Sequence, residues 1–528
     1  MNSNTHPVIK TLGFLCAVGL FSMLWMNRPD TPAFDLLPFP KWDDFMNSTQ
    51  SALQPEYIDT LLVAYDTYAR VDSNQSTLLT AETPDTAVVQ YSPNIQPKTT
   101  FQPTPNATKN DAFMASSYRH EFTNNSLHPN LQLQGSQSAF DQLANLFYRL
   151  HHRKGQRALH FFHFGDSQIE GDRITRSIRT SWQKRWGGFG IGYLAPKPLV
   201  APYSIVQTSS DGWQRHARFG RRDTTINHRR YGILASFATH EAPLETDETP
   251  WIRLKPRKHA GQNEQQVHSI KMLFGRTDSN ARMTCQVDSM LLGPFLIPPD
   301  STGSELIIPV AKLTASSVFE SIEFKFEGSV PEVDAIGMLP DTGLVFHNIA
   351  MRGSSGTLFR QLDRTQFSTQ LKSHDVGMIL LQFGGNAVPY IADTAAVKRY
   401  GEWFASQIRL FQTIVPNAAI VVIGPSDMAT KEEQYMITYP MLVPVRNALR
   451  QAALNENVLY WDVFEVMGGA GSMAAWVTSS PALASSDHVH FTRRGAKKIA
   501  SLLLQSLDAE WVAWEHWHSE KTPAQPLP

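Results

Sequence analysis

Two short stretches of the chain carry residue types that together could perform acyl transfer. Gly165, Asp166 and Ser167 follow an apolar run, and Asp487 and His490 stand three residues apart near the other end of the sequence. A serine hydroxyl becomes an effective nucleophile when an imidazole takes its proton and a carboxylate orients that imidazole. The residue types therefore predict Ser167 as nucleophile, His490 as base and Asp487 as orienting acid.

Other interpretations of these residues remain open. His488 follows Asp487 directly and is a rival base, but the side chains of adjacent residues point apart, which favours His490. A Gly-Asp-Ser stretch alone is usually only a turn, and Asp487 could merely cap the following helix. A chain that keeps these residues without turnover is a further alternative.

The nucleophile must be positioned by the elements on either side of it. The run from Ala158 to Phe164 predicts a strand that breaks at Gly165, and a helical pattern extends from Asp172 towards Trp186. Ser167 then lies on a turn at the carboxyl end of a strand, where α/β enzymes place a nucleophile. A helix is also predicted before the strand, from apolar residues at helical spacing: Phe140, Leu143, Leu146, Phe147 and Leu150.

The pattern changes between about residues 192 and 340. Short alternating segments, such as Val267–Phe274 and Ser321–Phe326, are separated by turn residues, which is typical of an antiparallel β-sandwich. An α/β rhythm then resumes. It predicts strands over 376–383, 418–424 and 458–462, and helices over 394–413, 439–455 and from after Thr492 through Leu503.

Four separated motifs resemble those of the SGNH hydrolases, also called the GDSL esterase family, and they occur in the family's order. The resemblance covers about 155–190 and 340–510. The motifs are Gly165-Asp166-Ser167, Arg352-Gly353-Ser354-Ser355-Gly356, Gly384-Gly385-Asn386 and Asp487-His488-Val489-His490. The resemblance implies a serine esterase without a metal or an organic cofactor, whose catalytic residues are Ser167, Asp487 and His490.

The same resemblance implies an oxyanion hole. Its donors would be the N–H groups of Ser167 and Gly356 and the side-chain amide of Asn386, which stabilise the charge of the tetrahedral intermediate. Two positions depart from the common pattern, because Ala387 replaces an Asp and Gln168 replaces a Leu. Neither change touches a core role.

The expected fold class is α/β, with an SGNH-type three-layer α/β/α domain around a parallel sheet, interrupted by a β-sandwich-like insertion. A membrane anchor would precede it. The expected parts are an anchor over 1–27, a mostly disordered tether over 28–137, the SGNH domain over 138–191 and 341–512, the β-rich module over 192–340 and a C-terminal tail over 513–528.

The N-terminus carries a targeting signal. An apolar stretch from Thr11 to Met26 follows Lys10 and precedes Arg28, and no convincing small-x-small cleavage site follows it. The sequence favours an uncleaved anchor over a removed signal peptide. The expected location is the inner membrane, with the catalytic domain in the periplasm, or secretion if the signal is cleaved.

Composition excludes several other classes of protein. The formal net charge of −1 points neither to nucleic acid nor to an acidic membrane surface. Two cysteines, Cys16 and Cys285, exclude a cysteine-based metal site. His151 and His152 are interpreted as a solvated helix end and not as a metal site, and His160 and His163 as satisfied buried histidines. Tyr203, Trp213 and Trp251 could stack on sugars, although core packing is more common.

The long insertion narrows the expected function. About 190 residues separate Ser167 from Gly356, where compact SGNH domains need a short connection. This arrangement resembles the peptidoglycan O-acetylesterases and implies an envelope enzyme that removes O-acetyl groups from a carbohydrate polymer. Two alternatives remain: an O-acetyltransferase with the same triad, and a non-catalytic envelope protein that binds glycans.

Overall fold

The computed structural model of the chain describes residues 90–91, 127–152, 156–220, 223–241, 249–313 and 317–521. One compact unit comprises the described residues within 52–430 and 436–528. The expected anchor at 1–27 and most of the expected tether at 28–137 lie outside the described residues. In the part of the chain that the structure describes, no helix is long and apolar enough to cross a membrane.

A parallel sheet forms the centre of the α/β part. Its strands are continuous apolar runs, as expected for strands that are covered on both faces. In the order of the sheet they are β14 (Leu344–Ala350), β2 (Leu159–Gly165), β15 (Val376–Gln382), β16 (Ala419–Ile423) and β19 (Leu459–Trp461). The four strand pairings of this sheet are parallel, so the carboxyl ends of its strands meet at one edge.

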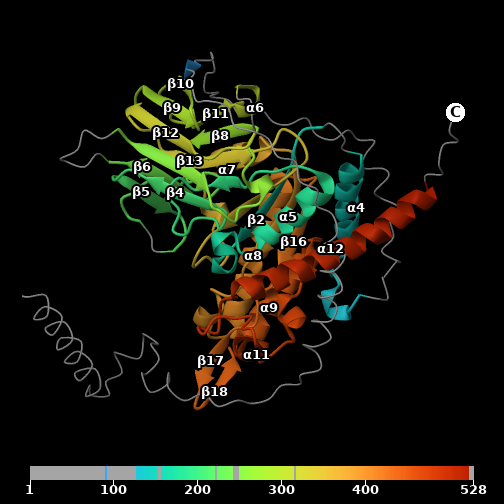
Figure 1. The fold of residues 1–528 in the computed structure, drawn as a ribbon. Coiled ribbons are helices and arrows are strands. Elements are labelled where there is room, and N and C mark those ends of the chain that lie inside the picture. The colour runs from blue at the N-terminus through green and yellow to red at the C-terminus, as the bar shows by residue number, and fades with distance from the viewer. Residues whose placement is uncertain are drawn as a thin grey trace, which may run out of the picture. The chain divides into compact units, whose positions relative to one another are not determined.

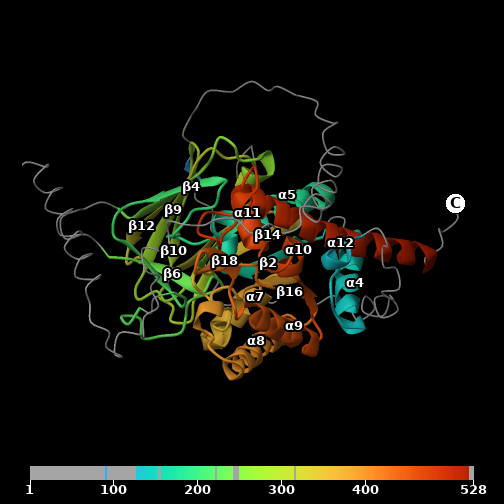
Figure 2. The same cartoon turned by 90° about the horizontal axis from the view of Figure 1, so that it is seen from below.

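Helices cover both faces of this sheet, because alternate strand residues enter two different cores. Phe161 belongs to one core and its neighbour Phe162 to the other. The first core includes residues of α4 (Gln137–His151), α5 (Thr175–Trp186) and α12 (Arg493–Lys521), and the second includes residues of α7 (Arg364–Lys372), α8 (Thr394–Ile414) and α9 (Leu442–Asn455). Figure 1 shows α12 beside α4 and α5, and Figure 2 shows α8 beside α9. The predicted three layers are present.

The β-rich module consists of two sheets around a third core. One sheet has the order β1 (Gln90–Tyr91), β10 (Met290–Ile297), β9 (Ala281–Val287), β12 (Ile322–Gly328), β7 (Trp251–Pro256) and β4 (Ile205–Ser209). The other has the order β11 (Ser304–Ile308), β8 (Ser269–Phe274), β13 (Val333–Leu339), β6 (Ser236–His240) and β5 (Trp213–Ala217), with β3 (Gly192–Leu194) paired to β13. Residues of both sheets share the core, as predicted for a sandwich.

The connections between these strands carry short helical segments. They are η2 (Pro129–Leu131), η3 (Ser167–Asp172), η4 (Gln262–Glu264), α6 (Val310–Leu313), η5 (Phe359–Gln361), η6 (Val388–Tyr390), α10 (Val463–Met467) and α11 (Ser472–Thr478). A separate two-stranded sheet pairs β17 (Ala429–Glu432) with β18 (Tyr435–Thr438).

Three segment boundaries differ from those expected. The last helix does not end near 503 or 512 but continues to Lys521, because Trp511, Trp514 and Trp517 pack into the first core. Within 28–137, Leu131 and Leu133 are buried in the same core, so the folded part begins earlier than 138. Strand β1, also within 28–137, pairs in parallel with β10 of the module.

The module shares a core with the α/β part. Phe237 of β6 and Leu273 of β8 belong to the same buried cluster as Phe164 of β2 and Phe404 of α8. Buried apolar surface of this kind holds two parts of a chain together more strongly than a polar contact does. The insertion therefore packs against the α/β part through a shared core and is not a separate domain joined only by a linker.

Candidate active site

The nucleophile turn begins where β2 ends. Gly165 lies opposite Ala350 of β14 and Gln382 of β15, so the loops that follow the three strands start at the same level. Asp166 stabilises the turn, because its Oδ1 accepts the backbone N–H of Gln168 at 2.9 Å. A side chain at Gly165 would approach Ile169 to 2.9 Å, so a glycine suits the close packing of this turn. The topology thus brings the first three motifs to one edge of the sheet.

The predicted triad is assembled in the structure. The Ser167 hydroxyl lies 2.8 Å from Nε2 of His490, and Nδ1 of His490 lies 2.8 Å from Oδ2 of Asp487. This arrangement leaves one imidazole nitrogen to accept the serine proton, while the other donates to the carboxylate. The distances are those that a nucleophile, a base and an orienting acid require.

Asp487 is held in its charged form by its surroundings. Burial alone would raise the pKa of this carboxyl group, but hydrogen bonds from His490 and Val489 outweigh burial and lower the pKa. The two backbone N–H groups donate to Oδ1, each at 2.9 Å. A carboxylate that accepts these bonds stays ionised and could stabilise an imidazolium at His490.

The Ser167 hydroxyl bonds to His490 and not to His488, the rival base. The backbone of His488 adopts a φ of 55°, and within the described residues its buried Nδ1 has no hydrogen-bond partner. Burial lowers the pKa of His488, although Asp487 opposes this. The geometry favours His490 as the base.

The predicted oxyanion donors are placed differently from one another. Asn386 lies in the wall of the cavity that contains Ser167 and His490, and its Nδ2 donates to the backbone oxygen of Ser354 at 3.2 Å. Gly356 has a φ of 80°, and its N–H donates to the Ser354 hydroxyl at 3.1 Å. Both donors are therefore engaged by Ser354 and would have to exchange that partner for an oxyanion. Their catalytic role stays a prediction.

Asp166 is a buried carboxyl group beside the predicted oxyanion donor Asn386. Burial raises its pKa to about 6. Hydrogen bonds from the Gln168 backbone and from Asn386, and the charge of His490, lower the pKa but do not outweigh burial. The contact with Asn386 connects the first motif to the third. Asp166 therefore orients a predicted oxyanion donor as well as the turn.

Gln168 has a role that the sequence did not reveal. Its side-chain amide donates to the backbone oxygen of Val489 at 2.6 Å and to the Ser426 hydroxyl at 3.1 Å. Its oxygen accepts the backbone N–H of Phe491 at 3.4 Å. Gln168 thus ties the nucleophile turn to the residues on both sides of His490. In the sequence, these contacts were indicated only by the presence of Gln168 where the family commonly has a Leu.

The cavity over Ser167 has a volume of about 250 Å³ and an aromatic rim. Pro389, Tyr390, Met428 and Tyr439 line it together with Ser167 and His490. Tyr390 is 87% exposed, so its ring is available to an incoming ligand. Exposed aromatic rings offer an apolar face with a polar hydroxyl at the edge, which suits a sugar. No motif in the sequence marks Tyr390 as a residue of this cavity.

The aromatic residues proposed from the sequence as sugar contacts have other partners. Trp213 is buried in the third core and lies 5.6 Å from the ring of Phe326. The guanidinium of Arg253 lies over Trp251, and those of Arg176 and Arg493 lie over Tyr203. Core packing is confirmed for Trp213.

The histidines of β2 are satisfied buried groups, as predicted. Nδ1 of His160 lies 2.9 Å from Nε2 of His347, and the ring of His163 contacts Gln382 and Thr175. Burial lowers the pKa of His163 to about 4, against the bond to Gln382. The lowered pKa keeps His163 neutral at neutral pH, and neither His160 nor His163 lines the cavity that contains Ser167.

His151 and His152 have a partner that the sequence could not show. His518 of α12 joins them, and the possible ligand atoms of the three side chains all lie within 4.8 Å of one another. Among the described residues this is the group with donors suited to a metal ion. The interpretation of His151 and His152 as a merely solvated helix end is therefore incomplete.

Comparisons with known proteins give the fold. No family model and no curated protein sequence matches the chain. The solved structure of a peptidoglycan O-acetylesterase aligns over 72% of this chain and 99% of its own, with a TM-score of 0.57 and 17% identity. An acetyl xylan esterase aligns over 31% of this chain and 81% of its own (TM-score 0.24, 16% identity). A family two carbohydrate esterase from Cellvibrio japonicus aligns over 58% and 99% (TM-score 0.22, 11% identity).

The first of these similarities covers both the α/β part and the module. It confirms the expected SGNH-type fold with a β-rich insertion. The site at the carboxyl edge of the parallel sheet is where this fold class binds its ligands.

Proposed function

We propose that this chain is a serine esterase of the cell envelope that removes O-acetyl groups from a carbohydrate polymer such as peptidoglycan. The observation that carries the proposal is the continuous relay from Ser167 through His490 to Asp487. The cavity over Ser167, with the exposed ring of Tyr390 at its rim, supports a sugar ester as the substrate. The similarity in fold to a peptidoglycan O-acetylesterase supports the same class of ester.

The reaction would proceed in two halves. In the first, Ser167 Oγ attacks the acetyl carbonyl carbon while His490 Nε2 takes the hydroxyl proton, and the tetrahedral intermediate places its negative oxygen near Asn386 and Gly356. The intermediate collapses, and the sugar oxygen leaves with the proton from His490. In the second half, His490 takes a proton from water, whose oxygen attacks the acetyl carbon. The second tetrahedral intermediate collapses, acetate is released, and the leaving Ser167 oxygen takes the proton back from His490.

An envelope location is part of the proposal. It rests on the apolar stretch from Thr11 to Met26, which lies outside the described residues. An anchor there, inserted in the inner membrane, would place the catalytic part in the periplasm. Cell fractionation with a C-terminal tag tests the location independently of activity.

The first prediction concerns Ser167. Full-length protein should release acetate from an aryl acetate and from O-acetylated sacculi, and Ser167→Ala should lower the aryl acetate rate by about 10⁴-fold or more. His490→Ala should cause a loss of similar size, because the two residues act as one unit. His488→Ala serves as the matched control at the neighbouring histidine and should retain most activity. If Ser167→Ala keeps the wild-type rate, the proposed function is wrong.

A second form of the assay distinguishes hydrolysis from acetyl transfer. Adding a soluble oligosaccharide acceptor to the aryl acetate reaction gives free acetate when water is the acceptor, and gives acetylated sugar when a hydroxyl is. The proposed esterase should yield free acetate. Acetylated oligosaccharide as the main product would identify a transferase.

A further inference from the structure

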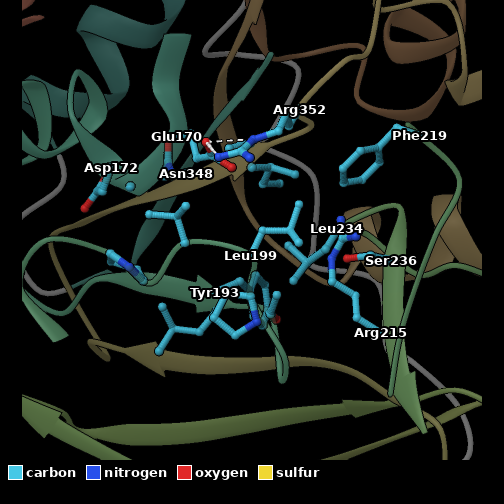
Figure 3. A pocket seen from close by; sticks show the side chains of 18 residues that line it. Glu170, Asp172, Tyr193, Leu199, Arg215, Phe219, Leu234, Ser236, Asn348 and Arg352 are labelled. Atoms are coloured by element: carbon cyan, nitrogen blue, oxygen red, sulfur yellow. Dashed lines mark hydrogen bonds and ion pairs between the residues drawn. The ribbon is translucent and has the colours of Figure 1, made fainter. Parts of the chain in front are cut away.

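A second pocket lies between the nucleophile turn and the β-rich module. Glu170 and Gly171 of the turn line one side, and Arg352 of the second motif lies beside them. Arg215 of β5 and Leu199 come from the module and from the segment leading into it. Figure 3 shows these side chains around one hollow, with Arg215 reaching upward from its strand. We call this hollow the Arg215 pocket.

The two arginines of the pocket have unequal partners. Arg352 donates through Nε, at 3.0 Å, and through Nη2 to one oxygen of Glu170 (Figure 3). Arg215 lies with its guanidinium 4.9 Å from the centre of the Phe219 ring, and no carboxylate among the described residues forms an ion pair with it. Burial lowers the pKa of Arg215, the charge of Glu170 opposes this, and the like charge of Arg352 adds to it. One half-buried positive charge is therefore left over.

The Arg215 pocket is mechanically connected to the catalytic residues. Glu170 is three residues from Ser167, so their Cα atoms lie within about 11 Å. Arg173 donates to the backbone oxygens of Glu170 and of Phe491, the residue after His490, at 2.9 and 3.3 Å. A polymer whose ester lies at Ser167 would therefore have neighbouring sugar units within reach of the pocket.

The lining suits an acidic sugar. A half-buried guanidinium without a counter-ion favours a carboxylate, because a planar carboxylate accepts two of its N–H groups at once. Leu199 is 58% exposed and Val200 is 44% exposed at this pocket, so apolar surface is available to the face of a sugar ring. A neutral glycan would use the apolar surface but leave Arg215 unpaired.

We propose that the Arg215 pocket binds a carboxylate of the acetylated polymer, so that the substrate is an acidic glycan and not a neutral one. This inference rests on the proposed esterase function. The carboxylate could belong to a uronic acid unit or to peptidoglycan. Both sources offer the same group to Arg215.

The test measures kcat/KM of the full-length protein on three acetylated polymers: a polyuronate, peptidoglycan sacculi and neutral xylan. Wild type should deacetylate at least one acidic polymer with a higher kcat/KM than xylan. Arg215→Gln should lower the ratio of acidic to neutral kcat/KM by about 10- to 100-fold, mainly through KM, because it removes hydrogen bonds to a charged group. Arg215→Lys keeps the charge but loses the planar fork, so its ratio should fall between the two. The acidic polymer that responds identifies the source of the carboxylate.

Arg282→Gln, at an exposed position on β9, is the matched control and should keep the wild-type ratio. A wild-type preference for xylan, or an unchanged ratio in both Arg215 variants, would overturn the inference while leaving the esterase intact. Wild type that hydrolyses no ester, including the aryl acetate, would instead contradict the proposed function.

A second inference rests on a separate observation, the histidine group formed by His151, His152 and His518. Nδ1 of His152 lies 3.0 Å from the backbone oxygen of Tyr148, and an N–H donated there leaves Nε2 with a free lone pair. His518 is buried and His151 and His152 are exposed, so the group lies where α4 and α12 meet at the surface. Neutral imidazoles are the form that binds metal ions.

We infer that these three imidazoles bind one divalent transition metal ion such as Zn²⁺, with a fourth position open to water. Zinc sites with three histidines and one water are a common coordination set. The nitrogens, now within 4.8 Å of one another, would draw together by small side-chain rotations to reach ligand distances of about 2.0–2.1 Å. The ion would join the end of α4 to α12.

Equilibrium dialysis of chelator-treated full-length protein against micromolar Zn²⁺ tests this site. Wild type should bind one ion per chain and gain thermal stability, since an ion that binds only the folded state stabilises it. His518→Ala should lose both effects. His516→Ala, two residues away on α12, should keep them. The absence of saturable binding in wild type, or equal binding by the two variants, would overturn the inference, and neither result bears on the esterase.

Discussion

At the scale of single residues, Asp166 connects catalysis to stability. The residue is 5% exposed, and burial raises the pKa of its carboxyl group from 3.8 to about 6. The folded state therefore holds a proton on Asp166 more tightly than the unfolded state does. Because the unfolded chain loses its proton first, stability falls as the pH rises from about 4 to 6, and the loss is complete above that range.

Asp166→Asn should consequently stabilise the protein at alkaline pH. The pKa difference corresponds to about 3 kcal/mol at pH 8 and to less than about 1 kcal/mol at pH 4, and the asparagine oxygen can still accept the Gln168 N–H. Denaturant unfolding at the two pH values measures the difference. The same substitution should lower kcat by about tenfold, because Asp166 no longer supplies a negative charge near protonated His490.

Asp211→Asn, at an exposed carboxylate, is the matched control for this experiment. Its stability relative to wild type should not change between the two pH values. An Asp166→Asn variant that is stabilised equally at pH 4 and pH 8 would contradict the argument from burial.

At the scale of elements, the site depends on loops that follow different strands. Ser167 follows β2 and Gly356 follows β14, whereas His490 precedes α12. Gln168 joins the first of these loops to the last through Val489 and Phe491. The relative position of Ser167 and His490 is therefore supported by a side chain that bonds to the backbone on both sides of His490.

Gln168→Leu, which restores the residue common in the family, should lower both stability and turnover. It leaves the Val489 oxygen and the Phe491 N–H without their side-chain partner, at a cost of about 1–3 kcal/mol for each group that stays buried and unsatisfied. We expect kcat to fall more than KM rises, since the loss concerns the position of His490. Unfolding curves and aryl acetate kinetics measure the two effects.

Gln412→Leu provides the comparison, because the Gln412 amide donates to the backbone oxygen of Glu456 on the helical side of the molecule. It should change stability slightly and leave kcat unaltered. A Gln168→Leu variant with wild-type kcat would show that the turn and the His490 loop keep their relative position without this tie.

These ties mark the limit of what the sequence could predict. Strand β2 was predictable because its apolar run ends at a glycine, and the triad because its residue types stand at characteristic spacings. Val489, a partner of Gln168, and His518, a partner of His151, each lie more than 300 residues away along the chain, and no local pattern reports such contacts. The length of α12 was an avoidable error, since Trp511, Trp514 and Trp517 repeat every three residues.

At the scale of the whole molecule, the shared second core couples the module to the catalytic part. We expect the described part of the chain to unfold in one cooperative transition, because neither part can expose Phe237 or Phe164 without opening the same cluster. Differential scanning calorimetry should show a single main endotherm. Phe237→Ala should lower its temperature without dividing it, at a cost of about 3–5 kcal/mol.

Esterase activity and near-ultraviolet circular dichroism should be lost together as the temperature rises. Two separated endotherms in wild type, with activity retained through the first, would show that the module folds independently. Val206→Ala, at an exposed position on β4, should leave the endotherm nearly unchanged.

The position of β2 in the sheet has a consequence for synthesis. Both neighbours of β2, the strands β14 and β15, follow the insertion, so about 180 residues must be translated after Gly165 before the first neighbour emerges. At about 5–20 residues per second, the ribosome needs roughly 10–35 s for this. During that interval a phenylalanine-rich strand has neither edge paired. The nascent chain should therefore bind chaperones at β2, and Ser167 should be synthesised more than 300 residues before its proposed partners Asp487 and His490.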